Sequence, residues 1–154
     1  MSIIVRDALL HFFHFTCIFA LASLLAGEAL LLRKSLPRNR VEQLRAVDRW
    51  YGIFAGLVIV TGVLLVFFGA KGASYYAHNA IFWTKMALFV TIALISIVPT
   101  VAFQRWNQRL GADGSVTLED DEYGRLRGVL WLQIGLLTLL PLCAALMANG
   151  LAAW

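Results

Sequence analysis

The chain has 154 residues, of which 60% are hydrophobic and only 14% are charged, and its formal net charge is +4. Soluble domains are about half apolar and about a quarter charged, so this composition excludes an ordinary soluble domain and indicates a membrane protein. Two cysteines without a CxxC pair exclude a zinc ribbon and a disulfide scaffold. The length fits a single integral membrane domain over residues 1–154.

The first predicted element is the apolar run from Ala8 to Leu32. It is longer than the core of a signal peptide, which has about 7–15 apolar residues, so we expect a retained membrane helix. Three further stretches are apolar and long enough to span a membrane, over about 51–70, 81–103 and 128–148. The fold class predicted from these stretches is an all-α, four-helix transmembrane bundle.

The polar segment before the last stretch carries signals for the start of a helix. Thr117 precedes four acidic residues at 119–122. A hydroxyl N-cap followed by acids in the first turn suits the positive end of the helix dipole. We therefore expect the fourth helix to cover about 118–148, after a turn in the sequence GADGS at 111–115.

The basic residues predict the orientation. Of thirteen lysines and arginines, six lie in 33–49 and four in 104–127, whereas Arg6 and Lys71 are alone on the other side. The positive-inside rule then places both loops in the cytoplasm and both termini outside. We expect a multi-pass protein of the bacterial inner (cytoplasmic) membrane with periplasmic termini. The charge is a topology signal that also attracts anionic lipid, so the partner is the lipid bilayer and not nucleic acid.

All three histidines fall at the predicted outer end of the bundle. His11 and His14 are three residues apart and share one stripe of the first helix. His78 and Lys85 are seven residues apart, so they share one face of the third helix. A charged side chain inside a span usually faces the bundle interior. We therefore expect the Lys85 face to point toward the stripe of the first helix.

This pattern is typical of a cofactor site between facing helices. Imidazole is an axial ligand of haem iron, so haem b could be held by His14 and His78, with Trp83 in the apolar wall. Lys85 would then contact a propionate or the substrate. A second hypothesis is copper or zinc bound by all three histidines, His11 included. A third is a non-catalytic scaffold, in which the polar side chains only orient the helices.

Glu28 lies in the predicted inner half of the first span, five residues before Arg33. One interpretation is an ion pair with Arg33, Arg49 or Arg105 that locks the helix orientation. The alternative is a catalytic carboxylate in a proton relay within the membrane. A redox role would need an electron donor or a quinone, and small-residue steps such as GLVIVTG would also allow a homo-oligomer.

Over nearly its whole length the chain resembles a bacterial family of predicted four-helix inner-membrane proteins of unknown function. The segments DRWYGIFAGLVIVTG, FWTKMALF and LLPLCAALMANG carry this resemblance. More remotely it is similar to HemJ-type protoporphyrinogen oxidases and CopD-type copper-resistance membrane proteins. Three features carry the remote similarity: an early histidine (His11 or His14), the series Arg49, Tyr51, Thr61 and Gly62, and Trp83 shortly before Lys85.

The remote resemblance implies a haem b protein with a redox or porphyrin-related role at its outer end. In HemJ-type proteins the early histidine and the lysine of the third helix are important, which points here to His14 (or His11) and to Lys85. The tryptophan and tyrosine of the first helix in that family are absent, since FALASLLAGEALLL stands in their place. The resemblance therefore implies no substrate.

Overall fold

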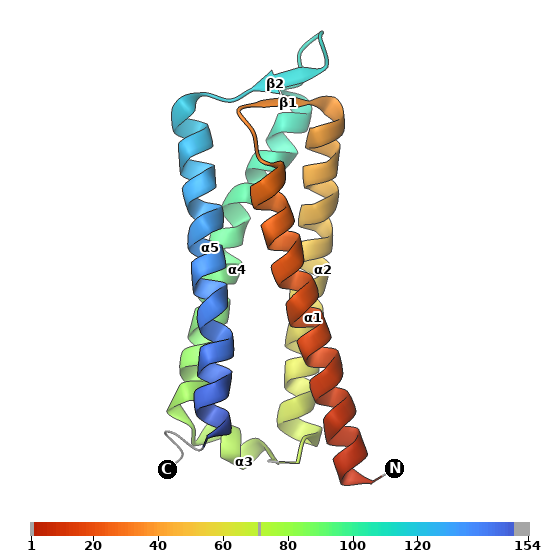
Figure 1. Cartoon of the computed structure of the whole chain (residues 1–154), viewed down its shortest axis with the longest axis vertical. Coiled ribbons are helices and arrows are strands. Elements are labelled where there is room, and N and C mark those ends of the chain that lie inside the picture. The colour runs from red at the N-terminus through yellow and green to blue at the C-terminus, as the bar shows by residue number, and fades with distance from the viewer. Residues whose placement is uncertain (1, 71, 150–154) are drawn as a thin grey trace.

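Four long helices run along one axis and form a bundle (Figure 1). The computed structural model describes residues 2–70 and 72–149. The long helices are α1 (Ile3–Leu31), α2 (Arg38–Phe68), α4 (Ala80–Gln108) and α5 (Asp120–Ala148), and they are connected through a short helix, α3 (Gly72–Ala77), and two short strands, β1 (Ser35–Pro37) and β2 (Ser115–Thr117). Each long helix is apolar and long enough to cross a membrane, which confirms the predicted all-α bundle with four spans.

The bundle has two distinct ends (Figure 1). We call the end where α1 begins and α5 ends the termini end, and the end that carries β1 and β2 the ribbon end. The structure places both basic loops at the ribbon end, but it contains no membrane, so the cytoplasmic location of that end stays a prediction. Lys71, which the sequence analysis counted on the side of the termini, lies outside the described residues.

Helix α2 begins at Arg38, far before the predicted start of the span at residue 51. The segment between these positions is polar on average, and the sequence analysis treated 33–49 as a loop. It folds as a helix that buries one face, because the apolar side chains of Val41 and Leu44 lie one turn apart and are both buried. Helix α4 likewise continues past residue 103 to Gln108, since Trp106 is fully buried.

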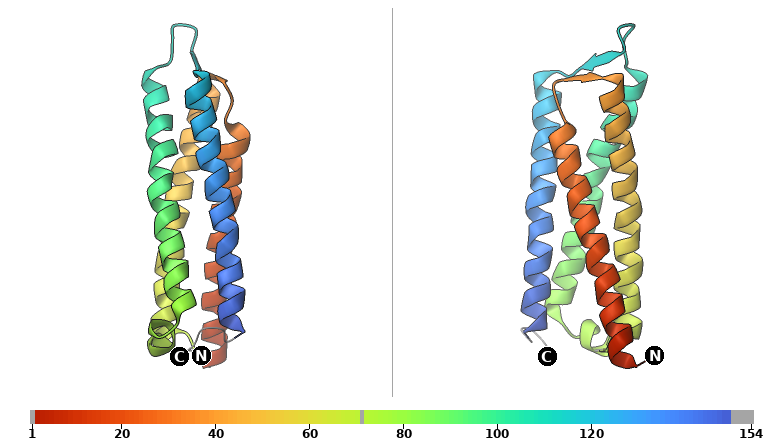
Figure 2. Two further views of the ribbon diagram at one scale, coloured as in Figure 1. Left: turned by 90° about the vertical axis from the view of Figure 1, so that its left-hand side faces the viewer. Right: turned by 45° about the vertical axis from the view of Figure 1, so that its right-hand side comes forward.

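The sequence analysis did not foresee the two-stranded ribbon. Strands β1 and β2 pair antiparallel, with Leu36 opposite Val116, and they join the α1–α2 loop to the α4–α5 loop. Both of these side chains are buried beneath the ribbon. The ribbon therefore covers one end of the apolar core, as the views in Figure 2 also show.

The ribbon also corrects the predicted start of the fourth helix. Thr117 pairs with Ser35 in the ribbon and is not the N-cap; Glu119 takes that position, and α5 begins at Asp120. The acids at 120–122 do lie in the first turn, as predicted. One of them, Asp120, forms an ion pair with Lys34, with Nζ 2.8 Å from Oδ1. The hydrogen bond in this pair raises the pKa of the Lys34 ammonium group.

The helices pack as two pairs, α1 with α2 and α4 with α5, and contacts between α2 and α4 are fewer. Large apolar side chains cover the outside of the bundle, for example Phe12, Phe19, Leu30 and Trp131, each more than half exposed. Such a surface suits a lipid bilayer and not water.

Candidate functional site

His14 is a buried imidazole at the contact between α1 and α2. Its side chain is 7% exposed, and its Nδ1 lies 2.9 Å from Thr61 Oγ1, 47 residues away in the sequence. Gly62 packs against the ring, because a Cβ there would contact His14 Cε1 at 3.4 Å. The Thr61–Gly62 step on α2 therefore forms the seat of this histidine.

The contacts of Thr61 define which ring nitrogen carries the proton. The hydroxyl has a single hydrogen, and it donates this hydrogen to the Leu57 carbonyl at 2.7 Å. Thr61 Oγ1 must therefore accept a hydrogen bond from Nδ1–H of His14. The neutral imidazole then carries its free lone pair on Nε2, the arrangement found in metal-bound histidines whose other nitrogen is fixed by a hydrogen bond.

Lys85 is the cationic side chain whose charge acts on His14. It is half-buried on α4, and it lies within electrostatic range of Cys143 of α5. All four long helices thus contribute to one polar region in the termini half: His14 from α1, Thr61 from α2, Lys85 from α4 and Cys143 from α5. The predicted inward direction of the Lys85 face agrees with this arrangement.

His78 lies apart from this region, whereas His11 lies one turn before His14 on α1 and acts on it electrostatically. His11 is half-buried, with Nδ1 2.9 Å from the Asp7 carbonyl, and His78 is exposed, with Nδ1 2.9 Å from the Ser74 carbonyl. A carbonyl only accepts, so both rings also carry their hydrogen on Nδ1. Within 2–70 and 72–149 no three His, Cys, Asp or Glu side chains gather closely enough to hold a metal ion.

Trp83 does not face the polar region. Its side chain is 60% exposed on the surface that lipid would cover, and its Nε1–H donates to the Ala77 carbonyl at 3.1 Å. The structure therefore brings together His14 and Lys85 from the predicted site. It places His78 and Trp83 at the periphery.

A second polar region lies in the ribbon half. Glu28 is only 1% exposed, and its Oε1 has no hydrogen-bond partner among the described residues. The ion pairs found in the described part of the chain do not include it, so no arginine orients this carboxyl there. Instead, Asp48 of α2 acts on it electrostatically.

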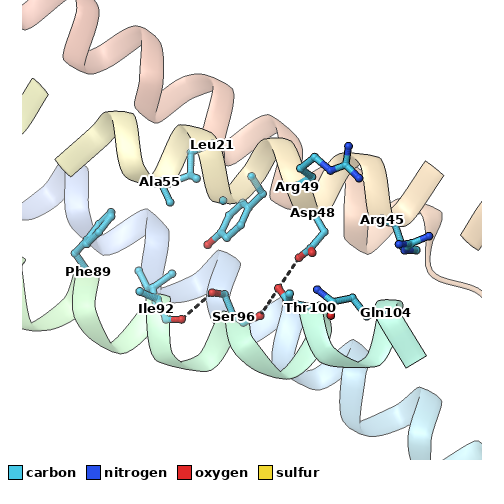
Figure 3. A pocket seen from close by; sticks show the side chains of 13 residues that line it. Leu21, Arg45, Asp48, Arg49, Ala55, Phe89, Ile92, Ser96, Thr100 and Gln104 are labelled. Atoms are coloured by element: carbon cyan, nitrogen blue, oxygen red, sulfur yellow. Dashed lines mark hydrogen bonds between the residues drawn. The ribbon is translucent and has the colours of Figure 1, made fainter. Parts of the chain in front are cut away.

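Asp48 lines a cavity of about 330 Å³ between α1, α2 and α4 (Figure 3). Asp48 Oδ1 lies 2.6 Å from Thr100 Oγ1, and Thr100 Oγ1 lies 3.0 Å from the Ser96 carbonyl. The full lining is Leu21, Arg45, Asp48, Arg49, Tyr51, Gly52, Ala55, Phe89, Ile92, Ala93, Ser96, Thr100 and Gln104. The cavity is thus polar toward the ribbon end and apolar toward the middle of the bundle.

Sequence reasoning missed Asp48, because it belongs to the polar segment that was interpreted as a loop. It also missed Ser96 and Thr100, which are four residues apart and therefore share one face of α4. That spacing was visible in the sequence. Only the α2–α4 contact shows that this face meets an aspartate.

The fold and the polar regions define a class: a multi-pass α-helical membrane protein with a seated imidazole in one half, and a buried glutamate and a half-buried aspartate in the other. The family model described as "Predicted membrane protein (DUF2214)" matches residues 6–152, and the chain belongs to this family. This match confirms the resemblance to a family of predicted membrane proteins. No curated protein and no solved structure matches the chain, so neither comparison links it to HemJ-type or CopD-type proteins.

Proposed function

We propose that the protein is a redox protein of the bacterial inner membrane that binds haem b through His14. The observation that carries this proposal is the seated imidazole, with Nδ1–H fixed by Thr61 and Nε2 left as a free ligand atom. Burial of this polar group in a membrane is costly, which favours a functional role over a chance position. Haem would supply one-electron chemistry when bound.

The donor set fits one axial ligand from the protein. His11 belongs to the same helix stripe as His14, and His78 is exposed and bonded to Ser74, so neither faces His14 across the bundle. Lys85 supplies a positive charge that suits a propionate group. The ring of Phe15, 6.4 Å from that of His14, offers apolar surface beside it.

The decisive experiment is a pair of absorption spectra, oxidised and dithionite-reduced, of the protein purified in mild detergent, with metal analysis of the same sample. We expect a Soret band and sharpened α and β bands on reduction. His14→Ala should remove them, whereas His78→Ala, the matched control, should keep them. An unchanged spectrum in His14→Ala would exclude this residue as the ligand.

A pair of glycine variants tests the seat without touching the ligand. Gly62→Val should place a branched side chain against His14 Cε1 and reduce haem content at least several-fold. Gly56→Val is the control, since a Cβ at Gly56 meets nothing within 4 Å and the change in helix propensity is the same. Haem per protein is measured as the pyridine haemochrome. Equal losses in both variants would contradict the proposed seat.

We propose a membrane quinol as the electron donor. The cavity supports this choice because it is apolar toward the bundle centre and polar toward the ribbon end, as an amphipathic quinone requires. Its residue Leu21 is seven positions after His14, about 10 Å along α1. A short-chain quinol should reduce the oxidised protein, and Phe89→Trp, which fills the apolar end, should slow that reduction at unchanged haem content.

Copper or zinc handling is the second candidate. It is supported by the free Nε2 of His14 and by the Cys143 thiol within electrostatic range of Lys85, which would be two ligands of different helices. Stoichiometric copper or zinc without porphyrin absorbance would support this candidate over haem. A sample that contains neither and rebinds neither would leave the scaffold hypothesis.

A further inference from the structure

The carboxyl group of Glu28 cannot be a stable anion in its surroundings. It is 1% exposed and lies on a helix that crosses the membrane, and its Oε1 meets no donor among the described residues. A buried carboxylate without a partner is far more costly than a neutral acid. No lysine or arginine of the described chain pairs with it.

Asp48 gives an independent indication of a bound proton. Thr100 Oγ1 has one hydrogen but lies within hydrogen-bond distance of two oxygens, Asp48 Oδ1 at 2.6 Å and the Ser96 carbonyl at 3.0 Å. The carbonyl can only accept. Both contacts are satisfied when Asp48 carries a proton and donates it to Thr100, which in turn donates to Ser96.

The charged and polar side chains around the Asp48 carboxyl come from α2 and α4. Helix α2 contributes Tyr51, on which both acids act, and the guanidinium groups of Arg45 and Arg49. From α4, the cavity lining contributes neutral polar side chains, namely Ser96, Thr100 and Gln104. In Figure 3, Arg45 and Gln104 lie at one end of the cavity, and Phe89 lies at the other.

We propose that Glu28 and Asp48 form a reversible proton-binding site inside the helix bundle, reached from the ribbon end through the cavity beside Asp48. On release, an acid O–H bond breaks and the proton passes to water in the cavity, with no change in oxidation state. The two arginines of the lining then balance the negative charge that remains. This site goes beyond the haem proposal and does not depend on it.

Dicyclohexylcarbodiimide provides the test, since it adds to protonated carboxylic acids in apolar surroundings and leaves a stable N-acylurea. The full-length protein in mild detergent is treated over a range of pH, and the label is located by peptide mass spectrometry. We expect one label per chain, on Glu28 or Asp48, that disappears at alkaline pH. The exposed Glu42 of α2 should stay unlabelled.

Two glutamine variants test whether Glu28 and Asp48 influence each other's protonation or are each protonated only because they are buried. Glu28→Gln removes one of the two charges, so labelling of Asp48 should fail at a lower pH than in the native protein. Glu42→Gln should leave the pH profile unchanged. If Glu28→Gln does not fold, the labelling map of the native protein decides alone.

Two results would overturn the proposal. One is the absence of any label on Glu28 and Asp48 in the folded protein at acid pH. The other is protection by sodium ions at constant pH, which would show that the carboxyls hold a metal cation and not a proton. The labelling result does not depend on whether the sample contains haem. Failure of the proton-site proposal can therefore be told apart from failure of the haem proposal.

Discussion

Gln133 is a buried polar side chain whose hydrogen bonds are only partly satisfied. It is fully buried on α5, its Nε2–H donates to the Ile92 carbonyl of α4 at a long 3.4 Å, and its Oε1 has no partner among the described residues. An unsatisfied buried oxygen costs about 1–3 kcal/mol. Interhelical hydrogen bonds in membranes contribute less, about 0.6 kcal/mol on average. Gln133 is therefore retained at a net cost to stability.

We expect Gln133→Met to raise the free energy of unfolding in detergent by about 1 kcal/mol, because it removes the unsatisfied oxygen and keeps the volume. The measurement is thermal or denaturant unfolding, compared with the native protein. A loss of stability would contradict this reasoning and would show that Gln133 has a polar partner such as an ordered water.

At the scale of elements, the β1–β2 ribbon is the feature that joins the two helix pairs outside the spans. It pairs residues 35–37 with 115–117, and it places Leu36 over the end of the core with no exposed surface. Two three-residue strands have little stability of their own. The ribbon is therefore held mainly by the apolar side chains beneath it.

Leu36→Ala should lower the free energy of unfolding by about 2–5 kcal/mol, the usual cost of a cavity in a packed core. Ser35→Ala is the control, because the neighbouring serine side chain is exposed. Both variants are compared by unfolding in the same detergent. Equal stability of the two would mean that the ribbon does not close the core in solution.

For the whole molecule, the fold gathers the basic segments at one end, and the charge pattern predicts which side of the membrane that end faces. Both basic loops lie at the ribbon end, and α1 begins at the opposite end. The positive-inside rule assigns the ribbon end to the cytoplasm. With this orientation, the seated His14 lies in the half nearer the periplasm and the carboxyls lie in the half nearer the cytoplasm.

Single-cysteine variants test this orientation. After replacement of both native cysteines, Ser74→Cys in α3 should react with a membrane-impermeant thiol reagent in intact spheroplasts. Ser35→Cys in β1 should react only after the membrane is opened. Both serine side chains are exposed, so accessibility within the fold is matched. The reverse pattern would invert the assignment of both polar regions.

The amino-acid sequence alone was enough to predict the number of spans, because each span needs about 20 apolar residues in one stretch and this is a local property. It also singled out His14, Lys85 and Glu28, since a polar residue inside an apolar stretch can be recognised without knowledge of how the helix is rotated. It missed the helical segment after Arg38, because amphipathic helix outside the apolar stretch has low mean hydropathy. The correct number of spans and the missed helical segment have the same origin in local composition.

Only the tertiary structure decided which polar side chains meet. His14 and Thr61 are 47 residues apart, and Asp48 and Thr100 are 52 residues apart. In a soluble helix the apolar stripe reveals the buried face, but here lipid-facing and core-facing positions are equally apolar. The rotation of each helix is therefore set by packing, by the ribbon and by the loops, and that rotation brings the imidazole to its seat and the carboxyls to their cavity.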